Sequence, residues 1–205
     1  MNSYITLKSF ASYEIVEKHS RFIAYAKPIK TEQEALDFLS EIRTKHWDAR
    51  HNVYAYVLRE NQLSRYSDDG EPGGTAGMPV LDVLKKSGIT DAVIVVTRYF
   101  GGTLLGTGGL VRAYSTSAKL AVEQAGLKTL TECLVCTLDC SYTQYGKIPS
   151  VISQFGGVDN ADFLDNVKLT FHIPIESKAE LEAKLSELSA GELKVIEKSK
   201  DFFEI

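Results

Sequence analysis

Arginine is missing from the last third of this 205-residue chain, since all seven arginines lie at or before Arg112. Glycine is also uneven, because ten of the fifteen glycines fall between Gly70 and Gly109. Residues 1–130 hold 16 basic and 14 acidic side chains, whereas residues 131–205 hold 7 and 13. The formal charge of −4 therefore hides two segments of different chemistry, which predicts two domains.

The chain also has few cysteines, no long apolar run and no visible leader. Its longest aliphatic run, Ala92–Val96, is far shorter than the roughly 20 residues that span a bilayer. The first ten residues have no apolar core behind a positive charge, so no signal peptide is expected. Three cysteines cannot form a disulfide framework, and an odd number fits a reducing compartment. We expect a soluble cytoplasmic protein that does not contact membranes.

Residues 1–129 are predicted to form a first α+β domain. The periodicity indicates strands at Tyr4–Phe10 and Phe22–Ala26, a helix after Thr31, a strand at Asn52–Arg59, a helix at Val80–Lys86, a strand at Asp91–Thr97 and a helix at Leu110–Ala125. Thr31 and Glu34 form a capping box at the start of the first helix. His46 lies on the apolar stripe of that helix, so we expect a buried, hydrogen-bonded histidine.

Residues 130–205 are predicted to form the second domain, with the order β-α-β-β-α-β of a ferredoxin-like fold. The expected elements are strands at Leu134–Cys140, Ala161–Leu164 and Val167–Ile173, a last strand that begins at Leu193–Ile196, and helices around Ile148–Phe155 and Leu181–Leu188. On the first strand Cys136 and Cys140 share one face and Cys133 lies on the other. Three thiolates cannot then converge on one metal, so we expect core packing and no metal site.

A first glycine-rich loop, Ser67–Gly77, holds three carboxylates within four residues: Asp68, Asp69 and Glu71. Such groups can bind Mg²⁺ or act as acid and base, because like charges held close raise one pKa. The simpler interpretation is a solvated turn in which the Asp side chains bond their own backbone. A third is a recognition loop that exposes the backbone of Gly73, Gly74 and Thr75 to a partner.

His51 lies at the entry to a predicted strand, and a Ser/His/Asp set can be drawn from Ser67, His51 and Asp68. The sequence has no G-x-S-x-G elbow around Ser67, and without one such sets arise by chance in most chains. The histidine therefore stays a candidate for an enzymatic alternative only.

A second glycine-rich loop, Gly101–Gly109, follows a buried strand and opens a helix, a geometry that suits an anion. Its turning glycines include Gly101, Gly102 and Gly106. Arg98 and Arg112 bracket it and could grip a phosphate bidentately. It is not a P-loop, because Thr107-Gly108 occupies the Lys-Ser/Thr places, nor a dinucleotide fingerprint, because Val111 occupies the last glycine place. The alternative is that the glycines only allow tight packing on the sheet.

Several long strings in and around the two loops resemble the YigZ/IMPACT family. They are Tyr54-Ala55-Tyr56, Ser67–Gly77, Val96–Gly102, Leu105-Gly106 and Gly109–Tyr114. The resemblance implies a first domain like the second domain of ribosomal protein S-five, and a second domain like the C-terminal domains of elongation factor G. Eukaryotic members regulate translation under amino-acid starvation, and they carry a different partner-binding domain, for which this sequence has no counterpart.

The resemblance and the glycine loops leave three hypotheses. The first is a translation-associated protein that binds RNA, the ribosome or a translation-regulating partner. The second is a hydrolase or nucleotide-handling enzyme that uses His51, Asp68, Asp69 and Glu71. The third is a protein–protein adaptor with an exposed apolar patch beside the loops. No cofactor is expected under the first and third.

Overall fold

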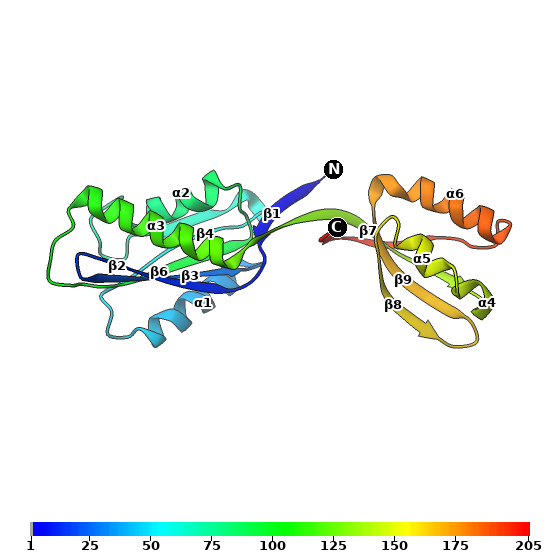
Figure 1. The fold of residues 1–205 in the computed structure, drawn as a ribbon, viewed down its shortest axis with the longest axis horizontal. Helices are drawn as coiled ribbons and strands as arrows, with labels where there is room; N and C mark the ends of the chain where they lie inside the picture. The colour runs from blue at the N-terminus through cyan, green and yellow to red at the C-terminus, as the bar shows by residue number, and fades with distance from the viewer. Residues whose placement is uncertain (1) are drawn as a thin grey trace. The chain divides into compact units, whose positions relative to one another are not determined.

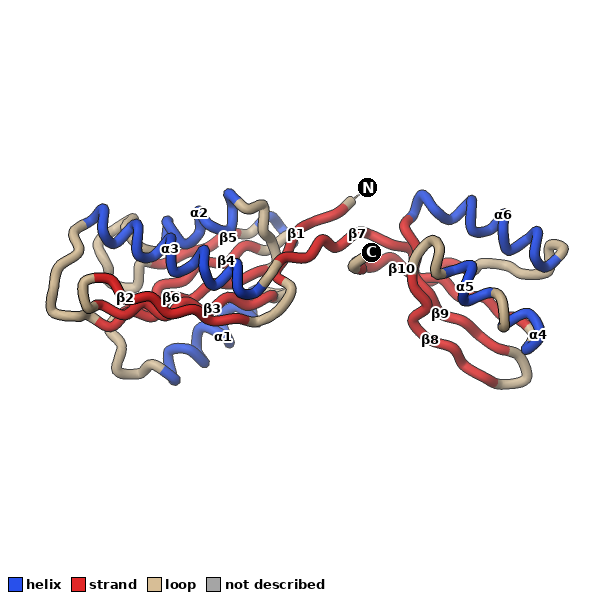
Figure 2. Tube along the Cα trace, viewed as in Figure 1, coloured by secondary structure: helices blue, strands red, loops and turns tan. Residues whose placement is uncertain are grey.

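The structure is a computed structural model that describes residues 2–205, in which six α-helices and ten β-strands form two compact units. One unit is Tyr4–Lys128, and the other is Thr129–Ile205 with residues 2 and 3 (Figures 1 and 2). The predicted α+β class is confirmed. Each unit has its own buried core, so each is described separately.

The first unit is an antiparallel sheet between two helical layers (Figure 1). Its strand order is β2-β3-β6-β4-β5. The strands are β2 (Ala11–Glu17), β3 (Ser20–Pro28), β4 (His51–Val57), β5 (Ser64–Ser67) and β6 (Ala92–Tyr99), and β1 (Ser3–Leu7) precedes them. One face is covered by α1 (Glu32–Lys45), and the other by α2 (Gly77–Lys86) and α3 (Thr107–Ala125).

The central strand β6 explains why helices cover both faces. Its side chains alternate between the two cores: Ile94 and Val96 pack towards α2 and α3, while Val93 and Val95 pack towards α1. All four are fully buried, as the continuous apolar run predicts. On α3 the small side chains that face the sheet are buried and allow the helix to lie close to it: Ala113, Ala118, Ala121 and Ala125.

Helix α1 begins and ends as its sequence predicts. The Thr31 hydroxyl accepts from the N–H of Glu34 at 3.2 Å, and the Glu34 carboxylate accepts from the N–H of Lys30 at 2.8 Å. At the other end His46 is buried, with Nε2 2.7 Å from the Tyr25 hydroxyl and Nδ1 2.9 Å from that of Tyr99. The predicted buried, hydrogen-bonded histidine is confirmed. Burial, followed by the charge of Lys45, lowers its pKa.

The second unit has the ferredoxin-like strand order. Its strands are β7 (Leu127–Cys140), β8 (Gly157–Phe163), β9 (Val167–Pro174) and β10 (Ile196–Phe203). The antiparallel order β10-β7-β9-β8 is the 4-1-3-2 arrangement of that fold. Its helices, α4 (Tyr142–Tyr145), α5 (Ile148–Ile152) and α6 (Lys178–Ser189), precede β8 and β10. Residues of α5 and α6, such as Ile152 and Leu185, share the core with Phe171 of β9.

The cysteines are packing residues, as predicted. All three are buried and free, and Cys136 and Cys140 lie in the core beneath the helices while Cys133 lies outside that cluster. Burial raises the pKa of Cys136 to about 11, so this thiol stays protonated at neutral pH. In the described part of the chain, no three His, Cys, Asp or Glu side chains gather as a metal site. No helix there is long and apolar enough to cross a membrane.

Candidate functional site

Asp68 serves as a remote cap for helix α2. Its carboxylate accepts three backbone N–H groups, from Gly74 at 2.9 Å, Ala76 at 3.0 Å and Gly77 at 2.8 Å. The residue at the N-cap position, Ala76, has no side chain able to do this. Asp68 therefore satisfies orphan donors at the helix start and folds the first glycine loop back on itself.

Asp69 points the other way and ties the loop to β4 and α1. Its carboxylate accepts from the N–H of Asn52 at 2.6 Å and from Arg43 at 2.8 Å. Its carbonyl oxygen lies 2.8 Å from Nδ1 of His51, so this nitrogen is the donor, because a carbonyl can only accept. The Ser67 hydroxyl accepts from the N–H of Asp69 at 3.1 Å. The Ser67, His51 and Asp68 side chains therefore do not form a relay.

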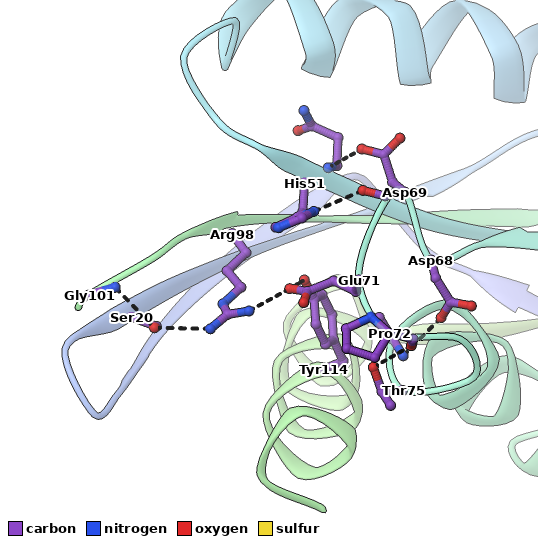
Figure 3. A network of polar contacts seen from close by, with 12 residues as sticks. Ser20, His51, Asp68, Asp69, Glu71, Pro72, Thr75, Arg98, Gly101 and Tyr114 are labelled. Atoms are coloured by element: carbon purple, nitrogen blue, oxygen red, sulfur yellow. Dashed lines mark hydrogen bonds and ion pairs between the residues drawn. The ribbon is translucent and has the colours of Figure 1, made fainter. Parts of the chain in front are cut away.

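Glu71 is the buried centre of the site (Figure 3). One carboxylate oxygen accepts from Nη1 of Arg98 and from the Tyr114 hydroxyl, both at 2.7 Å. The side chains of Arg98 and Glu71 are only 7% and 4% exposed. Burial, and then the negative charge of Glu71, raise the pKa of Tyr114, so the phenol stays protonated and donates. This contact joins the first loop to β6 and α3.

Arg98 also reaches the start of β3, where the second loop is anchored. Its Nη2 lies 3.4 Å from the Ser20 hydroxyl, which accepts from the N–H of Gly101 at 3.1 Å (Figure 3). Phe22 and Phe100 flank the guanidinium, with ring centroids 5.4 and 5.6 Å from its central carbon. Nε is buried and has no hydrogen-bond partner among residues 2–205.

The two arginines that bracket the second loop in sequence have different environments. Arg98 is buried in an internal ion pair, whereas Arg112 is exposed on α3. The expectation that both grip one phosphate at the loop is therefore not supported by the geometry. Arg98 instead has a structural role, because it connects both glycine loops and β3 through Glu71 and Ser20.

The glycines of the loops serve different purposes. A Cβ on Gly101 would lie 2.0 Å from the backbone carbon of His19, so this glycine allows direct packing on the turn between β2 and β3. Gly74, Gly102 and Gly106 have φ values of 76°, 84° and 73°, which favour glycine. Gly73 is exposed and unconstrained by neighbours. The hydroxyl of Thr75, which is buried, donates to the carbonyl of Pro72 at 2.7 Å, inside the loop.

Arg112 has a neighbour that sequence reasoning missed. Arg112 and Lys18 line one hollow of about 240 Å³, together with Gly109, Thr116 and the carboxylate residue Glu17. Neither cation has an ion-pair partner in the described chain. Lys18 lies in the turn between β2 and β3 and has φ of 46°. Only the strand pairing brings it to α3, so no local pattern around Arg112 could have revealed it.

Each of the two units contains a match to a known family model. A model described as "Impact N-terminal domain" matches residues 18–122, and one described as "Domain of unknown function (DUF1949)" matches residues 138–192. The chain is 39% identical to "IMPACT family member YvyE" of Bacillus subtilis, covering 97% of this chain and 96% of the relative. It is also 39% identical to "IMPACT family member YigZ" of Escherichia coli, covering 87% and 90%.

More distant relatives match a smaller share of the chain. "Protein IMPACT homolog" of Saccharomyces cerevisiae is 30% identical over 57% of this chain and 46% of its own length. A solved structure, "Crystal structure of an hypothetical protein", matches over 97% of this chain and 98% of its own with a TM-score of 0.63 and 36% identity. The likeness to that structure therefore extends over both units.

Proposed function

The chain belongs to the IMPACT family, and from this premise we propose that it is a translation-associated protein whose first domain binds RNA through phosphate. The resemblance to proteins of translation supplies the biological setting. The hollow lined by Lys18 and Arg112 supplies the means of binding. Binding is favoured over catalysis because the three carboxylates of the first loop are hydrogen-bonded to internal partners.

The observation that carries the proposal is the pair of cations beside α3. Lys18 and Arg112 face one hollow in which Glu17 is the only carboxylate residue of the lining. The guanidinium offers a planar fork for two phosphate oxygens, and the ammonium offers a compact point charge. Because neither is held in an internal ion pair within residues 2–205, phosphate would displace only water and counterions. Counterion release then makes the binding favourable and dependent on salt.

The enzymatic alternative has less support in the geometry. Asp68 accepts three backbone donors, Asp69 accepts from Asn52 and Arg43, and Glu71 is buried against Arg98. The three carboxylates therefore point to three different internal partners and do not converge on a common substrate position. The Nδ1–H of His51 donates to a backbone carbonyl, and no side-chain nucleophile among residues 2–205 is hydrogen-bonded to its ring.

The test is RNA binding by the full chain at low salt. Lys18→Gln combined with Arg112→Gln should weaken binding of a fluorescent uridine octamer at least about tenfold, because two charged phosphate contacts are lost. Lys8→Gln combined with Lys30→Gln removes the same charge from other exposed positions of the first domain and should change affinity less than about twofold. Fluorescence anisotropy measures both.

Equal binding by the wild-type protein and the Lys18/Arg112 variant would rule out this phosphate site. If the chain does not bind RNA but does bind a protein partner, the adaptor hypothesis is favoured instead. Phe100, directly before the second loop, and Leu104 within it are 52% and 82% exposed and give that alternative its own candidate surface.

A further inference from the structure

A second hollow lies on the other side of α3, between that helix and α2. Its volume is about 600 Å³, within the usual range for sites that take small molecules. Met78 and Val83 of α2 face Val111 of α3 and give it apolar walls. Hydroxyl groups of Ser87 and Thr116 also line it, and neither makes a hydrogen bond in the part of the chain that the structure describes. We call it the α2/α3 groove.

One stripe of α3 separates this groove from the hollow that holds Lys18. Arg112, Thr116 and Lys119 follow each other at i, i+4 and i+7, so they lie along one line of the helix surface. Thr116 lines both hollows, Arg112 lines the first and Lys119 lines the groove. A ligand that crosses this stripe therefore meets both hollows in succession.

The two hollows together carry more positive than negative side chains. Their linings contain four cations, Lys18, Arg112, Lys86 and Lys119, against the carboxylates of Glu17 and Asp82. Lys86 lies 3.1 Å from Asp82, and Lys119 lies 3.7 Å from Glu123, in exposed pairs one helical turn apart. Such pairs contribute little and open readily, so both lysines remain available to an anionic ligand.

The geometry points to a nucleotide site in the α2/α3 groove: the base lies between Met78 and Val111, and the adjoining phosphate lies on the Arg112–Lys119 stripe. This inference rests on the proposed function, because it adds a base-binding position next to the proposed phosphate position. The apolar walls suit the faces of a base, and the free hydroxyls of Ser87 and Thr116 suit its polar edge. The shared chemistry is that of a single-stranded RNA unit or a free nucleotide.

A peptide is the less suitable occupant. The groove offers apolar walls, unpaired hydroxyls and lysines around one compact space, whereas a docked helix needs a continuous apolar track to receive anchors at i, i+4 and i+7. The stripe beside the groove is polar and cationic along that spacing. Alternating apolar and phosphate-binding positions match the alternation of bases and phosphates along a strand.

The test fills the groove without changing charge. Val111→Leu combined with Ser115→Leu enlarges two side chains of its lining, and the Ser115 hydroxyl bonds only to carbonyls of its own helix, so its loss leaves no unpaired donor. Val16→Leu, at an exposed valine on β2, is the matched control. We expect the groove variant to bind the uridine octamer about tenfold more weakly, as loss of one base contact does, with its salt dependence unchanged. Circular dichroism and the melting temperature check that both variants fold.

The outcomes separate this inference from the proposed function. Wild-type affinity in a folded groove variant would overturn the groove proposal even where the Lys18/Arg112 variant binds poorly. Weakening by the groove variant alone would support the groove and reject the phosphate site. Uridine monophosphate that binds as tightly as the octamer would identify a free nucleotide as the ligand, whereas much weaker binding would identify a strand. Loss of a captured protein partner without loss of RNA binding would show a peptide occupant and overturn the proposal.

Discussion

Arg98 is held by groups from two distant parts of the chain. Glu71 from the first loop and Ser20 at the start of β3 contact it, and the Phe100 ring two residues along lies beside it. Glu71 also accepts from Tyr114. A buried ion pair is expensive to desolvate, so its value lies in fixing the elements that contribute to it. At the residue scale, the pair determines how the two glycine loops are placed, whereas under the proposed function the exposed cations are the groups that bind the ligand.

Glu71→Gln should destabilise the first domain by about 3 kcal/mol or more, because Arg98 is left as a buried cation without a counter-charge. Tyr114→Phe is the matched comparison, since it removes one hydrogen bond to the same carboxylate and should cost about 1 kcal/mol. Scanning calorimetry of the full chain measures both. A Glu71→Gln protein as stable as the wild type would show that the Arg98–Glu71 ion pair does not hold the two loops in place.

Residue type alone could not separate the two arginines of the second loop. Both Arg98 and Arg112 have the chemistry that grips phosphate, but only Arg98 has a carboxylate partner, and that partner is 27 residues earlier in the chain. Lys18 was missed for the same reason, because strand pairing places it beside α3. The motif loops could be located from sequence, whereas the direction of each side chain depended on tertiary contacts.

At the scale of elements, the second loop and the turn between β2 and β3 pack backbone against backbone. Gly101 lies directly on His19 and Ser20, and its N–H donates to the Ser20 hydroxyl. The turn that carries Lys18 is therefore positioned by the loop that precedes α3. This contact explains how the cations of two separate elements come to share one hollow.

Gly101→Ala should destabilise the first domain by about 1–3 kcal/mol, because the added methyl group would overlap the backbone of His19. Gly108→Ala is the control, since no atom beyond its chain neighbours and the backbone of its own helix lies within 4 Å of the added Cβ, and alanine favours the helix. It should be neutral or slightly stabilising. Urea unfolding of the two variants distinguishes them, and equal stability of the two proteins would contradict the packing argument.

The elements that sequence reasoning located are those with strong periodicity or clear caps. Helix α1 has the Thr31 cap, helix α3 ends at Gly126, and strand β6 is a continuous apolar run. Strands β2 and β5 were not predicted, since both lie at sheet edges and are largely exposed. The helix expected around Ile148–Phe155 is α5, which ends at Ile152, and the short helix α4 that precedes it was not predicted.

At the scale of the whole molecule, the charge is divided between two folded units. The arginine-bearing first segment holds the glycine loops and both hollows, and the acidic second segment forms the ferredoxin-like unit. A protein of this net charge is not expected to coat nucleic acid. The phosphate binding that we propose must then come from a local site, and its dependence on salt should reveal how few phosphates are contacted.

The salt dependence of octamer binding by the full chain tests the central claim most directly. For single strands, the logarithm of affinity falls against the logarithm of salt concentration with a slope of about −0.7 per phosphate contacted. Removing Lys18 and Arg112 together should make that slope shallower by about 1.4, while the Lys8/Lys30 control keeps the wild-type slope. An identical slope in the wild-type and Lys18/Arg112 proteins would contradict phosphate binding at α3.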